Sequence, residues 1–326
     1  MAVYTEVADE ELARFIAGYA LGSVVTCKGI AEGVENTNYL VGTTSGQFIL
    51  TLYEKRVDTG DLPFFLGLME HLAGKGLSCP TPVRDREGRN LSELAGRPAA
   101  LVTFLEGLWL RKPLACHCHS VGVALAQLHQ AGRDFEIIRR NALGPEGWRP
   151  LFERFRDRAN DIRPGLDEMI ENELQAVLRA WPRDLPHGVI HADLFPDNVF
   201  FMGDQLSGLI DFYFACNDAL AYDVAVCLNA WCFRDDLTFD LEKGAALLAG
   251  YQSVRRLTAA ERDSLPTLCR GAALRFLLTR AYDWVNTPAG AMVVKHDPIP
   301  YLERLLHHAR IADAGSGADY GLDGPR

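Results

Sequence analysis

The amino-acid sequence predicts an α+β protein in two lobes: a small antiparallel sheet with a helix, followed by a mainly helical lobe. Three observations lead to this prediction. Short β-branched or aromatic runs precede residue 106, long stretches with helical apolar spacing follow residue 107, and 326 residues suffice for about two domains. We therefore expect an N-terminal lobe over 1–106, a C-terminal lobe over 107–312 and a disordered tail over 313–326.

The N-terminal lobe begins with a predicted amphipathic helix over 9–19, which has apolar residues at helical spacing and acids in its first turn. Runs at 24–29, 37–42 and 47–53 are separated by Gly, Asn, Thr and Ser, and they predict an antiparallel meander. A predicted helix over 62–73 and a predicted strand over 99–105 follow. The lobe is therefore expected to be one helix packed on a small antiparallel sheet.

The C-terminal lobe is predicted to be helical on both sides of a small β element. The predicted helices span 120–130, 151–162, 167–181, 218–231, 238–255, 259–284 and 300–311. The strands of this lobe are expected between residues 188 and 212. The chemistry-bearing loop is therefore expected in the middle of this lobe.

Charge and composition narrow the class of partner. The chain has 33 basic and 43 acidic residues and a net charge of -10, which argues against nucleic acid or an anionic membrane as main partner. No apolar run is long enough for a bilayer span, and acids occupy the N-terminus where a signal peptide needs basic residues. Eight cysteines without a C-x-x-C pair favour a reduced, cytoplasmic protein.

The most informative segment is GVIHADLFPDNVFFMGDQLSGLID, residues 188–211, which predicts a strand, a polar loop and two further strands. His191-x-Asp193 is followed by Asn198, and Asp211 comes thirteen residues after Asn198. In phosphoryl transfer a carboxylate orients the attacking hydroxyl and accepts its proton, which suits Asp193. Asn198 and Asp211 offer the hard oxygen ligands that a phosphate-bridging metal ion needs.

Other interpretations of these residues are weaker. Pro196-Asp197-Asn198 is typical of an ordinary turn. An ordinary turn alone would leave the spacing of His191, Asp193, Asn198 and Asp211 to chance. A metal hydrolase using His191 and Asp193 would need a second histidine at ligand spacing, which is missing. The run at 116–119, Cys-His-Cys-His, suggests zinc, but adjacent residues of a helix point in different directions.

Two segments of the N-terminal lobe are candidates for ATP binding. The loop at 29–38 lies between two predicted strands, where backbone N–H groups could cradle phosphates; its candidate residues are Gly33, Asn36, Thr37 and Asn38. The run at 100–107 closes the lobe like a hinge whose backbone could bind adenine, through Thr103, Phe104, Leu105 and Glu106. A plain hairpin turn and an ordinary linker are the alternatives.

On these motifs the chain resembles small-molecule kinases of the aminoglycoside phosphotransferase and choline kinase-like superfamily, which have a bilobal protein-kinase-like fold. It is more narrowly similar to the homoserine kinase branch, through segments such as GVENTNYLV, FILTLYE, VTFLEG, GVIHADLFPDNVFF and RFLLTRAYDW. The resemblance covers residues 4 to 312. It implies that ATP and Mg²⁺ bind between the lobes and that L-homoserine becomes O-phospho-L-homoserine, a step of threonine biosynthesis.

The resemblance also implies roles for individual residues. Asp193 would be the catalytic base, and Asn198 and Asp211 the Mg²⁺ ligands. His191 and Asp223 would brace the catalytic loop. For Asp223, a favourable acid in the first turn of a helix is a compatible second explanation.

The chain departs from protein kinases in ways that favour a small acceptor. Ala192 stands where many protein kinases have Arg, and Asp211-Phe-Tyr lacks the usual glycine. The short stretch after Asp211 leaves no room for a long activation loop. Thr51 stands where a phosphate-pairing Lys or Arg is expected, so Lys28 or Lys55 would have to supply that charge.

An amino-acid acceptor needs a cation for its carboxylate, and Arg275 and Arg280 are the candidates. They lie about 140° apart around a predicted helix, so one is expected to face the site and the other a surface partner. Tyr213, Asp218 and Trp231 are candidate pocket residues, with core packing as the alternative for the aromatic rings. Choline, methylthioribose, an aminoglycoside or another amino alcohol remain alternative acceptors. A silent kinase-like binding protein is a further alternative, motivated by Thr51.

Overall fold

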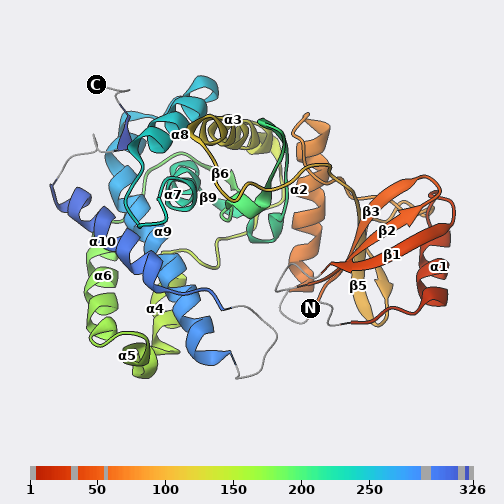
Figure 1. Ribbon diagram of the computed structural model, residues 1–326, viewed down its shortest axis with the longest axis horizontal. Helices are drawn as coiled ribbons and strands as arrows, with labels where there is room; N and C mark the ends of the chain where they lie inside the picture. The colour runs from red at the N-terminus through yellow and green to blue at the C-terminus, as the bar shows by residue number, and fades with distance from the viewer. Residues whose placement is uncertain (1–4, 31–35, 55–57, 288–294, 315–319, 323–326) are drawn as a thin grey trace. The chain divides into compact units, whose positions relative to one another are not determined.

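The computed structural model describes residues 5–30, 36–54, 58–287, 295–314 and 320–322. The chain forms two compact units (Figure 1): the described residues up to Glu106 make the first, and those from Gly107 onward make the second. None of the helices in these ranges has the length and apolar character needed to cross a bilayer.

The N-terminal unit is built on one antiparallel sheet with the strand order β1-β2-β3-β5-β4. Its strands are β1 (Val24–Ile30), β2 (Thr37–Thr43), β3 (Gly46–Leu52), β4 (Ser92–Leu94) and β5 (Arg97–Thr103). The predicted meander and the later strand are confirmed. The short β4 was not predicted, because three residues are too few to show a strand period.

Two helices belong to this unit, α1 (Asp9–Ala17) and α2 (Leu62–Gly74). Leu12 and Ile16 of α1 join Val41, Leu50 and Leu52 in one buried cluster. These strand residues alternate along the chain because every second side chain points to the same face of a sheet. Helix α1 therefore covers one face of the sheet, and both helices predicted for this lobe are present.

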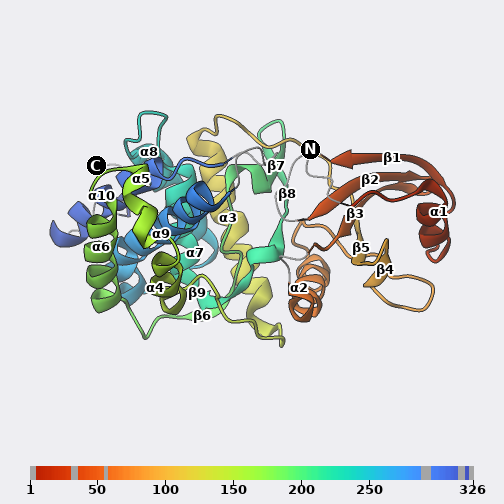
Figure 2. The same cartoon turned by 90° about the horizontal axis from the view of Figure 1, so that it is seen from below.

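The C-terminal unit is mainly helical, as predicted (Figure 2). Its helices are α3 (Ala115–Ala131), α4 (Pro145–Glu153), α5 (Ala159–Ile162), α6 (Leu166–Ala180), α7 (Leu220–Trp231), α8 (Leu241–Val254), α9 (Ala259–Asn286) and α10 (Ile299–Ala314). The single helix expected over 151–162 is wrong. Helix α4 starts earlier, at a proline that suits the first helical turn, and a 3₁₀ turn over Arg156–Arg158 separates it from α5.

Two short antiparallel ribbons frame the loop at 191–198. Strand β6 (His187–Ile190) pairs with β9 (Cys216–Ala219), and β7 (Val199–Met202) pairs with β8 (Gln205–Leu209). The last two residues of β9 were predicted as the start of the helix over 218–231, because Asn and Asp carry no strand signal. Its pairing with β6 overrides that local preference.

Helix α9 is the central element of this unit and contacts α4, α6, α7 and α10. It begins with a capping box: Thr258 Oγ1 accepts a hydrogen bond from Glu261 N at 3.2 Å, and a Glu261 side-chain oxygen accepts one from Thr258 N at 2.8 Å. Helices α3 and α8 pack together, with Gly122 and Gly250 at the contact.

The tail is more ordered than expected where the structure describes it. Helix α10 continues to Ala314, and Tyr320 is buried with its hydroxyl 2.8 Å from His308 Nδ1. A buried tyrosine usually finds a hydrogen-bond partner for its hydroxyl, as Tyr320 does here. The remaining tail residues lie outside the described ranges.

Candidate active site

The loop that follows β6 is held by a buried carboxylate. Asp223, in the first turn of α7, accepts hydrogen bonds from the backbone N–H of His191 at 2.7 Å and of Ala192 at 2.8 Å. Its side chain is fully buried. The bracing position predicted for Asp223 therefore has a concrete geometry, because both oxygens bind the loop that carries Asp193.

His129 of α3 completes this anchor and was not singled out from the sequence. Its Nε2 lies 3.1 Å from Asp223, and its Nδ1 lies 2.8 Å from the hydroxyl of Tyr251. Burial alone would raise the pKa of Asp223, but the hydrogen bond from His129 and the loop contacts hold that pKa below its usual value. A lone histidine within a predicted helix gave no signal of this role.

His191 links the loop to the strand that ends before Asp211. Its Nε2 lies 3.0 Å from the carbonyl oxygen of Ile210, so this nitrogen donates the hydrogen bond. Burial lowers the pKa of His191, which keeps the imidazole neutral. The side chain thus bridges the two segments that carry Asp193 and Asp211.

Asp193 and Asn198 lie at the two ends of the same short loop. The Asn198 side-chain Nδ2 donates to the Asp193 carbonyl at 2.8 Å and lies 3.5 Å from its carboxylate. The Asn198 carbonyl accepts a hydrogen bond from Ile210 N at 3.0 Å, which joins this loop to the residue before Asp211. Asp211 is exposed and has a left-handed φ of 62°.

The donor set here fits a magnesium ion shared with phosphates. The Asn198 amide nitrogen is turned to Asp193, so the amide oxygen is the atom that can ligate a cation, and Asp211 adds a carboxylate. Mg²⁺ usually takes one or two protein oxygens together with phosphate and water oxygens. No group of three or more His, Cys, Asp or Glu side chains capable of holding a metal alone occurs among the described residues.

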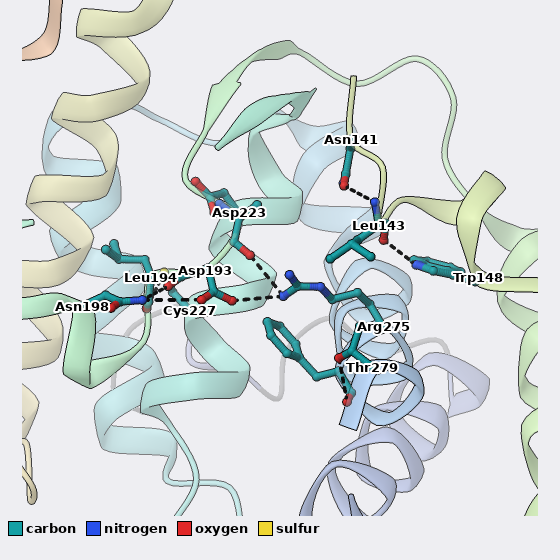
Figure 3. Close-up of polar contacts among 12 residues, drawn as sticks. Asn141, Leu143, Trp148, Asp193, Leu194, Asn198, Asp223, Cys227, Arg275 and Thr279 are labelled. Carbon is teal, nitrogen blue, oxygen red and sulfur yellow. Dashed lines mark hydrogen bonds and ion pairs between the residues drawn. The ribbon is translucent and has the colours of Figure 1, made fainter. Parts of the chain in front are cut away.

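Arg275 of α9 contacts Asp193 directly. Its NH1 lies 3.3 Å from Asp193 Oδ1 and 3.3 Å from the carbonyl oxygen of Ala192 (Figure 3). The guanidinium is 4% exposed and stacks 3.8 Å from the Phe276 ring centroid. Burial raises the pKa of Asp193, and the Arg275 charge opposes that rise.

Arg280 lies on the same helix and takes a different position. Its guanidinium carbon is 4.4 Å from the Tyr301 ring centroid, and its NH1 lies 3.4 Å from the carbonyl oxygen of Asp297. The side chain is half-buried. The two arginines therefore take different positions: Arg275 contacts Asp193, and Arg280 contacts the backbone of the exposed Asp297.

The other acceptor candidates differ in their positions. Trp231 is 1% exposed, and its indole nitrogen donates to the Leu194 carbonyl at 2.7 Å, so it supports the loop from inside and does not line a pocket. Asp218 Oδ2 accepts a hydrogen bond from the Asn141 amide at 2.7 Å. Tyr213 is half-buried in the turn that follows Asp211.

The nucleotide candidates of the N-terminal unit form side-chain hydrogen bonds among themselves. Thr51 Oγ1 donates to Asn38 Oδ1 at 2.8 Å, across a residue pair of β2 and β3. Thr37 Oγ1 donates to a Glu54 carboxylate oxygen at 2.8 Å, and Asn36 Oδ1 accepts from Glu54 N at 3.3 Å. Gly33 and Lys55 lie outside the described residues, and Lys28 is exposed.

The segment after β5 has irregular backbone, as expected of a connection. Thr103 closes the strand, where its Oγ1 accepts from Thr81 N at 2.9 Å. Phe104 and Glu106 are exposed, and Leu105 is half-buried. Residues 104–107 belong to no helix or strand.

The run at 116–119 has a structural role. His117 accepts a hydrogen bond from Leu114 N through Nδ1 at 2.9 Å, and its Nε2 lies 3.0 Å from Asp204. Both ring nitrogens are therefore engaged, at the start of α3 and with the turn between β7 and β8. Within the run that suggested zinc, His117 thus caps and anchors this helix.

Comparison with known proteins gives the family. A model described as the phosphotransferase enzyme family matches residues 26–257. The chain is 61% identical over 323 residues to a homoserine kinase of Chelativorans sp. (strain BNC1), with 99% of both chains covered. It is 61% identical over 322 residues to a homoserine kinase of Rhizobium meliloti (strain 1021), covering 99% of this chain and 98% of the relative.

Solved structures share the fold at low sequence identity. A spectinomycin phosphotransferase in complex with ADP and spectinomycin is 12% identical, has a TM-score of 0.68 and covers 95% of this chain and 99% of its own. A choline kinase from Cryptosporidium parvum is 15% identical, with a TM-score of 0.64 and coverage of 90% and 91%. The predicted fold class, an antiparallel-sheet unit followed by a helical unit as in protein-kinase-like phosphotransferases, is confirmed. The chain belongs to the phosphotransferase enzyme family and, within it, to the homoserine kinase group.

Proposed function

We propose that this protein transfers the γ-phosphoryl group of ATP to the side-chain hydroxyl of L-homoserine, giving O-phospho-L-homoserine for threonine biosynthesis. The observation that carries this proposal is the 61% identity with homoserine kinases over 99% of both chains. The loop of Asp193 supports it, because a buried, braced loop presents a half-buried carboxylate as phosphoryl transfer requires.

Asp193 is the proposed catalytic base. It orients the acceptor hydroxyl and takes its proton as the phosphoryl group moves in line. Asp223 and His191 hold the loop through its backbone N–H groups and through the carbonyl of Ile210. These contacts keep the carboxylate in one place, and such positioning supplies much of the rate in this class of reaction.

The N-terminal unit is the proposed nucleotide-binding domain, and the C-terminal unit carries the catalytic loop and the acceptor site. Asn36, Asn38 and Thr51, with the backbone of residues 103–106, are the proposed ATP contacts. Asn198 and Asp211 would hold Mg²⁺, which when bound neutralises phosphate charge. Eight free cysteines fit the reducing cytoplasm that we propose as its location.

An acceptor panel tests this function. Purified protein with ATP and Mg²⁺ is assayed for ADP release with L-homoserine, choline, methylthioribose and an aminoglycoside as separate acceptors. We expect turnover with L-homoserine and background rates with the other three. A higher kcat/KM with any other acceptor would keep the chemistry and overturn the substrate, while nucleotide binding without turnover on any acceptor would favour a silent binding protein.

A further inference from the structure

Two arginines of the C-terminal unit lie against one aromatic ring. The guanidinium carbons of Arg280, on α9, and Arg304, on α10, are 4.4 Å and 4.5 Å from the centroid of Tyr301. Helices α9 and α10 pack along each other, which brings the two side chains together from segments 24 residues apart (Figure 1). Of these two arginines, only Arg280 was a candidate from the sequence.

These two positive charges are not matched by acids. Within the described residues, neither guanidinium has a carboxylate oxygen at ion-pair distance. Arg280 donates a hydrogen bond to a backbone carbonyl oxygen, and the Nε of Arg304 is buried without a hydrogen-bond partner among the described residues. Burial lowers the pKa of Arg280, and the charge of Arg304 adds to this decrease, while Tyr301 and the more distant carboxylates of Asp193 and Asp197 oppose it. A nearby anion would relieve both the repulsion and the unmet hydrogen bond.

The Tyr301 ring connects the arginine pair to the proposed catalytic loop through contacts with two other aromatic rings. The Tyr301 ring is 5.0 Å from the Phe276 ring and 6.5 Å from the ring of Phe195, which is two residues after Asp193. Tyr301 is fully buried, and its hydroxyl has no hydrogen-bond partner among the described residues. The charges of Arg280, Arg304 and Asp193 all act on this hydroxyl.

Arg275, the other arginine that the sequence suggested for an acceptor carboxylate, is already engaged by the loop that carries Asp193. Its NH1 is shared between the Asp193 carboxylate and the Ala192 carbonyl oxygen, both at 3.3 Å, and it is almost fully buried. Of the two arginines that the sequence suggested for an acceptor carboxylate, one is therefore committed to the loop. The other has Arg304 as a neighbour.

Resting on the proposed function, we propose that Arg280 and Arg304 form the receptor for the α-carboxylate of the amino-acid acceptor. A guanidinium fork matches a carboxylate through two parallel hydrogen bonds. The site then selects an acceptor that carries an anion near its hydroxyl, and it disfavours cationic acceptors such as choline and aminoglycosides, which would meet two like charges. This separates homoserine from the other acceptors considered above by charge alone.

The test compares L-homoserine with 3-aminopropan-1-ol, which keeps the hydroxyl and the ammonium group but lacks the carboxylate. Arg280→Gln and Arg304→Gln are compared with Arg310→Gln, an exposed arginine on the same helix α10. We expect each of the first two variants to lose about 10- to 100-fold in kcat/KM on L-homoserine. On 3-aminopropan-1-ol, a cation without a carboxylate, we expect them to keep the wild-type kcat/KM or to raise it, because one repelling charge is gone. Arg310→Gln is expected to match the wild type on both.

Equal losses on both acceptors, or no loss on L-homoserine, would overturn the receptor. Calorimetric titration of L-homoserine and 3-aminopropan-1-ol separates this outcome from failure of the proposed function. Suppose that the wild type binds L-homoserine without phosphorylating it, and that this binding is lost in the Arg280 and Arg304 variants. This result would support the receptor and reject the proposed reaction. Binding of L-homoserine that is unaffected by both substitutions, or no binding to the wild type, would reject the receptor.

Discussion

The loop that carries Asp193, the proposed catalytic base, is held from three sides. Asp223 binds the N–H groups of His191 and Ala192, His191 binds the carbonyl of Ile210, and Arg275 binds Asp193 and the carbonyl of Ala192. Ala192 has a φ of 62°, a left-handed conformation that a non-glycine residue adopts only where its surroundings enforce it. The hydrogen bonds on both sides of its peptide units supply that constraint.

Arg275→Met is predicted to move the acid limb of the kcat/KM profile to higher pH. Asp193 must be ionised to accept a proton, so activity is lost as the pH falls through its pKa. Burial already raises this pKa, and loss of the Arg275 cation raises it further, so the variant loses activity at a higher pH than the wild type. At pH 7 we expect kcat/KM to fall by about 10- to 100-fold because Asp193 is also less well held.

Arg275→Lys is the matched control for this change. It keeps the positive charge, so its acid limb is expected close to that of the wild type even where its rate is lower. An unshifted acid limb in Arg275→Met, measured with L-homoserine over the same pH range, would show that the ion pair does not control the ionisation of Asp193.

The residues that sequence could identify are those within one short segment. His191, Asp193, Asn198 and Asp211 were assigned because their spacing forms a motif, and the structure joins the first three to the strand that precedes Asp211. His129 approaches from a helix about sixty residues upstream of that motif, so only the fold brings it to Asp223. The same holds for Arg304 in α10, which no local pattern marks.

At the scale of elements, the contact between α3 and α8 depends on two glycines, whose lack of a side chain lets the helices approach closely. A Cβ at Gly250 would lie 2.1 Å from the His119 carbonyl oxygen, and one at Gly122 would lie 2.1 Å from that of Leu247. The helices therefore approach until backbone meets backbone. Helix α3 also carries His129, and α8 carries Tyr251, so this contact sets the position of the anchor for Asp223.

Gly250→Ala is predicted to destabilise the fold by about 2 kcal/mol, because its methyl group has no room without separating α3 from α8. Gly74→Ala, at the end of α2, is the control, since its Cβ would meet nothing within 4 Å. We expect that change to be neutral or to stabilise by about 0.5–1 kcal/mol. Chemical denaturation measures both, and equal stability of the two variants would show that α3 and α8 can separate freely.

The elements that were predicted well are those with a strong period. The meander of the N-terminal unit and the long helix α9 have clear patterns, and their predicted limits lie within about two residues of those observed. Strands β4 and β9 were missed because they are short and are created by pairing with β5 and β6. The prediction of one helix over 151–162 was wrong, because the apolar spacing continues across the 3₁₀ turn at Arg156–Arg158 and gives no sign of it.

At the scale of the whole molecule, the chemistry assigned to the C-terminal unit depends on elements far apart in sequence. The loop that carries the proposed base lies between two short ribbons, its anchor comes from α3 and α7, and the arginine that contacts Asp193 comes from α9. Sequence established the family and the motif. The proposed carboxylate receptor came from the packing of α9 against α10, which a sequence pattern does not reveal.

The most direct test of this account is the kcat for L-homoserine phosphorylation by the wild type, Asp193→Asn and Asp197→Asn, with O-phospho-L-homoserine measured as the product. Asp197 lies on the same loop, is exposed and serves as the control. The account predicts product formation by the wild type and Asp197→Asn, and a loss of about 10²- to 10⁴-fold in Asp193→Asn. Product formation at a wild-type rate by Asp193→Asn would contradict the assignment of the catalytic base.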